Sequence, residues 1–273
     1  MADINPDAVP LIDVGRFDEL DRSHRAGDFV RWMEHQRRAG ADRALDLLAL
    51  GHDERVLEIG SGTGVDLAAL ADQAGHAVGV DRSLNMAETG KARIEGRGAS
   101  VAVADGHDLP FAAGTFDACW ARAVLVHTED PQQVVAELAR VLRPGGRVVL
   151  SEPDHGSHIV STSELDVFER IKAHRRNRFR NPLVGRRLGD LVTQAGLAIT
   201  ANWVTPLLHR SLAAARASGG PFDVAVQAAV DDGAITAEEG DRYLASLTEL
   251  DARGAFVFAA LAVSTAAVSP AVP

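Results

Sequence analysis

Three glycines at alternate positions, Gly60, Gly62 and Gly64, separate an apolar run from a helix-like run in the stretch VLEIGSGTGVDLAAL (56–70). A glycine turn between a strand and a helix adopts backbone angles closed to other residues and lets a ligand approach main-chain N–H groups. Glu58 stands two residues before the first glycine, and a second acid, Asp81, ends AVGVD about twenty residues later. This arrangement predicts a nucleotide-binding turn.

The position of the third glycine bears on which nucleotide binds. The dinucleotide fingerprint G-x-G-x-x-G places its third glycine where this chain has Val65. A nicotinamide oxidoreductase would still explain a glycine turn followed by Asp81 and Arg82. Against it, Tyr243 is the only tyrosine and has Leu247, not a lysine, four residues later.

Short apolar segments alternate with amphipathic ones between Arg55 and Glu152, which is the pattern of a parallel sheet covered on both faces. The expected strands are Arg55–Ile59, Ala77–Asp81, Ser100–Ala104, Phe116–Ala121 and Gly146–Ser151. Helices are expected to begin near Gly64, Ser83 and Pro131, the last with Asp130 as N-cap. RPGG (143–146) is expected to turn the chain into the fifth strand.

After Pro153 the pattern becomes more helical. Ser163–Arg178 and Gly185–Ala195 read as helices, Thr236 and Glu239 as a capping box, and Leu197–Thr205 and Phe256–Val268 as strands. We expect residues 1–50 to form a helical cap or lid. Residues 51–273 would form the main domain, with a helical insertion at about 207–253.

Several ordered motifs carry a family resemblance: VLEIGSGTG, GVDRSLNM, VADGHDLPF, FDACWARAVLVHTEDP and ELARVLRPGGRVVLSEPD. With them the chain resembles the class I S-adenosylmethionine-dependent methyltransferases, and among these the small-molecule enzymes of the ubiquinone/menaquinone-biosynthesis type. The later stretches NPLVGRRLGDLVTQAGL and ITAEEGDRYLASL are similar to those of actinobacterial members. The resemblance implies an α/β, Rossmann-like fold with a seven-stranded, mostly parallel sheet whose last strand is antiparallel.

The resemblance also implies a site for S-adenosylmethionine. Its methionine part would be held by Glu58 and by the backbone of the glycine turn, which comprises Gly60, Ser61, Gly62, Thr63 and Gly64. Arg122 and Ala123, at the end of the fourth strand, would lie by the methionine carboxylate and the methyl group.

For the nucleoside part, Asp81 would accept hydrogen bonds from both ribose hydroxyls, and Asp105 one from the adenine amino group. Gly106 and His107 would lie beside the adenine. Arg82 and Met86 would line the two faces of the ring. Each acid could instead serve as a helix cap or a surface charge.

Methyl transfer from a sulfonium needs chiefly in-line placement of the acceptor in a dry pocket, and a general base only for a protonated acceptor such as a phenol or alcohol. His127 in LVHTEDP is one candidate base, although it also fits a helix-entry residue that shapes the cofactor site. His155 in EPDHGSH is another, and Asp154 would orient it. A solvated loop explains this second cluster equally well. No H-x-x-x-H spacing supports a metal site.

The composition of the chain limits the classes of partner that it could bind. The net charge of −10 and the lack of an N-P-P-Y-like tetrapeptide disfavour a nucleic-acid substrate. One basic run, Lys172–Arg187, would meet an anionic ligand, an acidic subunit surface or only solvent. The single cysteine, Cys119, excludes an intramolecular disulfide, and no apolar run is long enough to cross a bilayer.

We therefore expect a cytoplasmic enzyme with a small natural-product or quinone-like acceptor, methylated on oxygen or carbon, and a homodimer is compatible with the sequence. An enzyme that keeps the cofactor but catalyses a rearrangement or ring closure remains an alternative.

Overall fold

The computed structural model describes residues 41–217, 220 and 222–271 of the chain. These fall into two units. The sheet unit comprises residues 41–153, 183–205 and 262–271. Among the described residues, the helical unit comprises 154–182 and the described part of 206–261. Most of the predicted N-terminal cap, residues 1–40, lies outside the described residues, so the cap stays a prediction.

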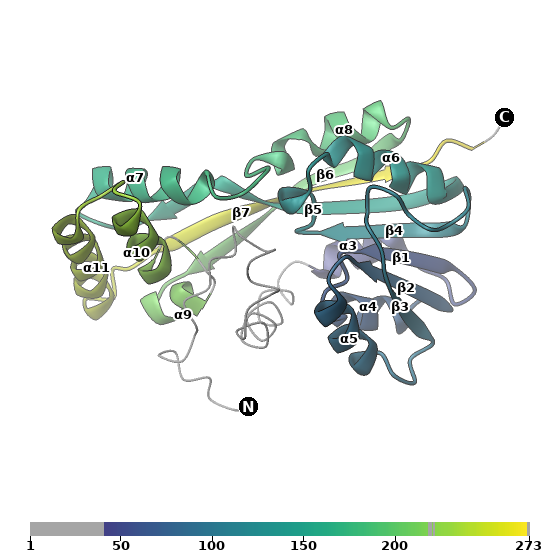
Figure 1. Cartoon of the computed structure of the whole chain (residues 1–273), viewed down its shortest axis with the longest axis horizontal. Coiled ribbons are helices and arrows are strands. Elements are labelled where there is room, and N and C mark those ends of the chain that lie inside the picture. Colours follow the sequence, from purple (N-terminus) through teal and green to yellow (C-terminus); the bar gives the residue numbers. More distant parts are fainter. Residues whose placement is uncertain (1–40, 218–219, 221, 272–273) are drawn as a thin grey trace. The chain divides into compact units, whose positions relative to one another are not determined.

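The strands form one seven-stranded sheet in the order β3-β2-β1-β4-β5-β7-β6 (Figure 1). Their bounds are β1 Arg55–Ile59, β2 His76–Asp81, β3 Ala99–Val103, β4 Phe116–Arg122, β5 Leu142–Val160, β6 Ala198–His209 and β7 Phe258–Val268. β1 pairs in parallel with β2 and β4, β2 with β3, and β4 with β5.

The last strand runs the other way. In the sheet unit Gly145 N donates to Ser269 O (2.9 Å), whereas the later Ser151 meets the earlier Ser264 through their hydroxyls. Partners that ascend on one strand and descend on the other mean that β7 is antiparallel to β5. The predicted seven-stranded, mostly parallel sheet with an antiparallel last strand is confirmed.

Helices in the sheet unit follow the predicted starts. They are α3 Ala41–Leu48, α4 Val65–Ala71, α5 Leu84–Arg93, the short η2 Leu125–His127, α6 Pro131–Val141, η3 Val184–Arg187 and α8 Leu188–Gln194. Asp130 caps α6 as expected, since its Oδ1 accepts from the N–H groups of Gln132 (2.9 Å) and Gln133 (3.1 Å). The core against the sheet includes Leu48, Leu67 and Trp120, all at most 1% exposed.

The fifth strand is longer than predicted. The RPGG turn lies inside this strand as an irregularity. Phe116 of β4 pairs with Leu142, but Ala118 pairs with Arg147, so the register shifts at the turn. At its other end, EPDHGSH belongs to the strand and is not the solvated loop that its polarity suggested. In the helical unit Ser161 N donates to Val257 O (2.9 Å), so pairing with the chain near β7 holds this polar segment extended.

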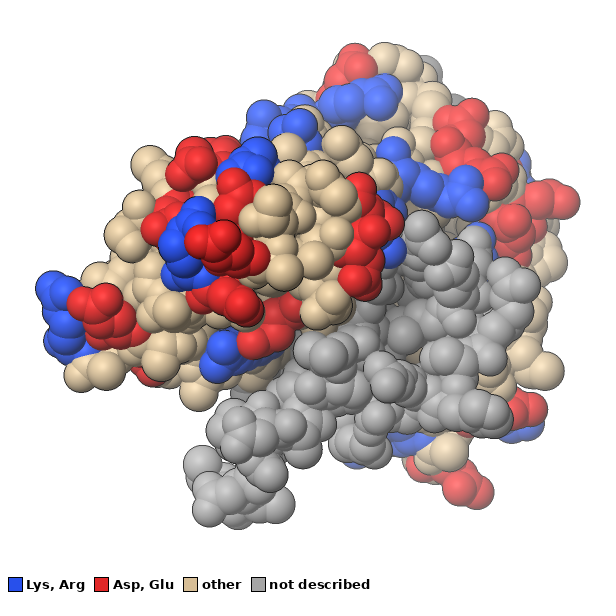
Figure 2. Space-filling model, turned by 60° about the vertical axis from the view of Figure 1, so that its left-hand side comes forward, with Lys and Arg blue, Asp and Glu red and all other residues tan. Residues whose placement is uncertain are grey.

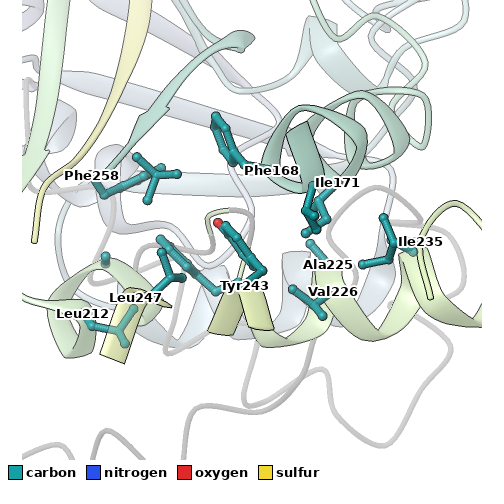
Figure 3. Close-up of a cluster of buried hydrophobic side chains, with 14 of the residues drawn as sticks. Phe168, Ile171, Leu212, Ala225, Val226, Ile235, Tyr243, Leu247 and Phe258 are labelled. Atoms are coloured by element: carbon teal, nitrogen blue, oxygen red, sulfur yellow. The ribbon is translucent and has the colours of Figure 1, made fainter. Parts of the chain in front are cut away.

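The helical unit contains α7 Leu165–Arg176, α9 Leu212–Ala217, α10 Asp223–Asp231 and α11 Ala237–Ala252. The insertion expected at about 207–253 stays a prediction. The predicted capping box is confirmed: Thr236 Oγ1 accepts from Glu239 N, and Glu239 Oε2 accepts from Thr236 N (2.8 Å). Glu239 also pairs with both terminal nitrogens of Arg170 (3.0 and 2.7 Å), tying α11 to α7. Figure 3 shows the buried core of this unit, in which Phe168 and Tyr243 face each other with ring centroids 6.3 Å apart.

Part of the basic run is neutralised within the helical unit. Lys172 pairs with Glu169 (2.6 Å), and Arg178 pairs with Asp232 (2.8 Å). On the face drawn in Figure 2, basic and acidic side chains lie interspersed. These pairs favour the interpretation of the run as a paired, solvated surface.

Candidate functional site

The glycine turn connects β1 to α4 with three left-handed residues. Gly60, Gly62 and Gly64 have φ of 64°, 51° and 73°, a region that side chains rarely adopt. A Cβ added at Gly60 would overlap the side chain of Val124, so the turn and the segment after β4 are in close contact. The turn therefore needs glycine both for its dihedral angles and for space.

Two further glycines, which sequence reasoning missed, pack against this turn. A Cβ at Gly79, inside β2, would lie 2.6 Å from Leu67 Cδ2, and a Cβ at Gly90, on α5, would lie 2.9 Å from the Gly62 carbonyl oxygen. A Cβ added at Gly64 would in turn lie 3.1 Å from the Gly90 Cα and carbonyl oxygen. A glycine inside a strand pattern indicates a close approach of another part of the chain, so the sequence alone could have indicated the role of Gly79. Gly90 was not, because its contact depends on how α5 docks.

Asp81 ends β2 beside the turn. Its Oδ2 accepts from Gly62 N (2.8 Å) and its Oδ1 from Ser83 N (2.9 Å), and the residue is 7% exposed. Asp81 thus ties the glycine turn to the start of α5.

The other residues predicted for the turn are buried under it. Glu58 on β1 is 1% exposed, Ser61 is fully buried and Thr63 is 2% exposed. Met86 on α5 is likewise buried, whereas Arg82 is exposed. The structure brings these predicted residues together within the sheet unit.

Asp105 lies after β3 with 62% of its side chain exposed. Its Oδ1 accepts from His107 N (2.9 Å) and lies 2.6 Å from His107 Nδ1. His107 Nε2 accepts from Asp130 N, so its proton is on Nδ1 and is donated to Asp105. The hydrogen bond from the His107 backbone N–H has the largest effect on the pKa of Asp105. Together with the bond from the His107 ring it holds this pKa below its usual value, although partial burial acts in the opposite direction. Gly106 lies between them and is half-buried.

Arg122, the last residue of β4, forms a bidentate ion pair with Asp66 in the first turn of α4. Nε lies 3.0 Å from Oδ2 and Nη2 lies 3.0 Å from Oδ1, with the side chains 12% and 7% exposed. Asp66 was not among the predicted site residues. One hydrogen bond and a second close contact between the charged groups fix the plane of the guanidinium as well as its position.

The segment after β4 is held by a buried acid. Glu152 on β5 is fully buried and accepts from three consecutive N–H groups: Val124 (2.9 Å), Leu125 (2.8 Å) and Val126 (3.2 Å). Burial raises the pKa of Glu152 to about 7, although these three bonds oppose the shift. The sequence showed Glu152 only as a member of the EPDHGSH cluster.

Within this segment Ala123 has φ of 54°, a strained value for a residue with a side chain, and its N–H donates to Ser151 O (2.9 Å). His127 ends η2 and is half-buried. Burial, helped by the charge of Arg82, lowers the pKa of His127 to about 4. His127 is therefore neutral at pH 7.

His155, the other predicted base, belongs to the helical unit. Its Nδ1 lies 3.0 Å from Arg175 Nη1, and its ring stacks on Phe179 with centroids 3.7 Å apart. Because a guanidinium can only donate, Nδ1 is the acceptor and the ring proton is on Nε2. Asp154 Oδ1 accepts from Gly156 N (2.8 Å).

In the described part of the chain, no group of three or more His, Cys, Asp or Glu side chains is arranged to hold a metal ion. Among the same residues, no helix has the length and apolar character needed to cross a membrane.

Comparison with known proteins agrees with this geometry. Residues 57–150, which run from β1 into β5 and include the turn, Asp81, Asp105 and Arg122, match the family described as "Methyltransferase domain". Over residues 57–150 the chain therefore has the sequence of a methyltransferase domain, on the class I fold described above. S-adenosylmethionine is the cofactor of this family.

The chain is also similar to the demethylmenaquinone methyltransferase of Clavibacter sepedonicus, with 38% identity over 128 residues, which are 41% of this chain and 52% of that protein. It spans about half the length of the curated relatives it matches.

Among solved structures, the YcgJ protein from Bacillus subtilis has a TM-score of 0.60 at 20% identity, covering 84% of this chain and 97% of that one. The [4+2]-cyclase SpnF has a TM-score of 0.53 at 19% identity, covering 85% and 80%. At these identities the similarity shows the fold alone.

Proposed function

We propose that the protein transfers the methyl group of S-adenosylmethionine to an oxygen or carbon atom of a small quinone-like or natural-product acceptor. The observation that carries the proposal is the Asp81 carboxylate, bonded to the Gly62 amide within a matched methyltransferase domain. The similarity to a demethylmenaquinone methyltransferase supports a quinone-like acceptor.

In this proposal the cofactor lies along the carboxyl ends of β1, β2 and β4. Asp81 would accept from the ribose hydroxyls, and Asp105 from the adenine amino group. Arg122, oriented by Asp66, would bind the methionine carboxylate. The backbone N–H groups of the glycine turn would complete that end of the site. The cofactor itself supplies the electrophilic methyl group.

For a hydroxyl acceptor we propose His127 as the proton acceptor, since it is neutral at pH 7. A pKa of about 4 makes it a weak base, which suits an acidic phenol or enol better than an alcohol. His155 fits this role less well, because its Nδ1 already faces the Arg175 guanidinium and its Nε2 carries the proton.

The fold does not distinguish methyl transfer from cyclisation, since SpnF has a similar fold. Product mass does. The protein is to be incubated with S-adenosylmethionine and a panel containing reduced demethylmenaquinone and simple phenols, then analysed by mass spectrometry. A product heavier by one methyl in place of hydrogen, with S-adenosylhomocysteine formed in equal amount, is expected. Conversion of an acceptor without a change in mass would refute methyl transfer.

A further inference from the structure

The post-β4 segment, residues 123–127, contacts both the glycine turn and β5 within the sheet unit. Val124 packs so closely on Gly60 that a Cβ added to this glycine would overlap the valine side chain. The N–H of Ala123 donates to Ser151 O on β5 (2.9 Å). A change in the conformation of this segment would therefore reach the turn directly.

The backbone of the segment depends on its surroundings. Ala123 has φ of 54°, a strained value that neighbouring contacts must maintain. The next three N–H groups, of Val124, Leu125 and Val126, stand at the start of the short helix η2, where helical N–H groups have no partner inside the helix. Glu152 Oε1 accepts from the first two and Oε2 from the third. One carboxylate thus satisfies all three.

Glu152 is fully buried, so it acts on a ligand only through the residues that it holds. Burying a carboxylate is costly, and hydrogen bonds to its oxygens offset part of that cost. An apolar side chain at this position would avoid the cost, but it would leave three backbone N–H groups without this acceptor. The acid is therefore suited to fixing the backbone of the post-β4 segment.

We propose that Glu152 is a positioning residue for the amino-acid part of S-adenosylmethionine. It holds the post-β4 segment so that Val124 keeps the glycine turn in the conformation that binds this part of the cofactor. The inference rests on the proposed function for its ligand. Arg122, which would bind the methionine carboxylate, directly precedes the held segment.

The nucleoside part of the cofactor would depend on other strand ends. Asp81 ends β2 and Asp105 follows β3, whereas the bonds of Glu152 go to the segment after β4. Loosening this segment therefore weakens binding of the amino-acid part and leaves binding of the nucleoside part nearly unchanged. This selectivity distinguishes positioning from a general loss of stability.

The test uses two ligands that share the nucleoside and the sulfur. S-adenosylhomocysteine carries the amino-acid chain on sulfur, and 5′-methylthioadenosine carries only a methyl group. Calorimetry at pH 8 measures their affinities for the full chain and for Glu152→Gln. Glutamine keeps one acceptor oxygen, but its amide nitrogen cannot accept from Val126 N–H. We expect S-adenosylhomocysteine to bind the variant about tenfold more weakly, and methylthioadenosine to bind both proteins within about twofold.

Hydrogen exchange, followed by mass spectrometry without ligand, tests whether the segment carries the effect. The amides of Val124, Leu125 and Val126 should exchange faster in Glu152→Gln than in wild type, while those of β2 should not. Val124→Ala keeps the Glu152 bonds and reduces the contact with Gly60, so it should also weaken S-adenosylhomocysteine selectively. This second variant tests the inference if circular dichroism shows that Glu152→Gln has not folded.

Asp117→Asn is the matched control. Asp117 is a buried acid at the opposite end of β4, where it accepts from Arg55 N (2.7 Å) and pairs with Arg143. Its substitution also removes a buried carboxylate from the sheet unit, but away from the post-β4 segment. Asp117→Asn should therefore bind both ligands like wild type.

The inference is wrong if Glu152→Gln binds S-adenosylhomocysteine like wild type, if both ligands weaken equally, or if exchange of the three amides is unchanged. Any of these results leaves the proposed function standing when wild type binds S-adenosylhomocysteine and methylates a member of the acceptor panel. Failure of wild type to bind S-adenosylhomocysteine or S-adenosylmethionine would instead refute the proposed function.

Discussion

Replacing Glu152 by glutamine should change how the protein's stability depends on pH. The carboxyl is fully buried, and burial raises its pKa from the ordinary 4.5 to about 7. A raised carboxyl pKa means that the folded state binds the proton more tightly than the unfolded chain does. Glu152 therefore stabilises the fold most below pH 4.5, and this contribution is lost as pH rises through 7.

The size of the effect follows from these two values. Between pH 5 and pH 8 the pKa difference removes about 2.5 kcal/mol from the free energy of unfolding of wild type. Glu152→Gln cannot titrate at this position. Its stability relative to wild type should therefore rise by about this amount over the same pH range.

Urea unfolding at pH 5 and pH 8 measures this difference. Trp120 and Trp203 are buried in the sheet unit and report on its unfolding by fluorescence. Other titrating groups are shared by both proteins, so they cancel in the comparison. A wild-type advantage that is constant with pH would refute the reasoning. One that grows with pH would show that the three N–H donors outweigh burial and that the carboxyl is ionised.

Three other substitutions test the cofactor site and the proposed proton acceptor. Gly90→Ala places a methyl group 2.9 Å from the Gly62 carbonyl oxygen and should weaken S-adenosylhomocysteine binding, measured by calorimetry, by about 1–3 kcal/mol. Asp66→Asn removes the charge that orients Arg122 and should raise the KM for S-adenosylmethionine about tenfold in a steady-state assay. His127→Gln should lower kcat for hydroxyl acceptors. Wild-type kcat should show no loss from His127 protonation between pH 8 and pH 6, since the pKa of this histidine is about 4.

Matched controls accompany these variants. Glu88→Ala changes an exposed residue of the same helix as Gly90 and should leave cofactor affinity unchanged. Asp72→Asn breaks an exposed pair with Arg97 and should not alter KM. The steric account of Gly90 fails if its alanine variant binds like the Glu88 control. Unchanged KM in Asp66→Asn would mean that Arg122 needs no orienting partner. A kcat that falls with an apparent pKa between 6 and 8, in wild type but not in His127→Gln, would contradict a low His127 pKa.

Local signals predicted much of the fold. The apolar segments placed the strands of the sheet, and the Asp130 cap and the Thr236–Glu239 capping box depend only on neighbouring residues. The glycine spacing placed the turn, and the acid ending β2 proved to contact it.

What the sequence did not predict are contacts between residues far apart in the chain. Asp66 with Arg122, and Glu152 with the N–H groups of Val124–Val126, form only when separate strands and helices are assembled. The predicted extent of β5 was wrong because the polar residues after Ser151 have the composition of a loop. The backbone pairing of this segment and the burial of His155 depend on elements much later in the chain.

Cofactor binding is the central claim, and calorimetry with S-adenosylhomocysteine tests it most directly. We predict binding of one molecule per chain of wild type, weakened at least about tenfold in Asp81→Ala, because the ribose hydroxyls would lose their acceptor. If neither S-adenosylmethionine nor S-adenosylhomocysteine binds, while NADH or NADPH does, the account is contradicted.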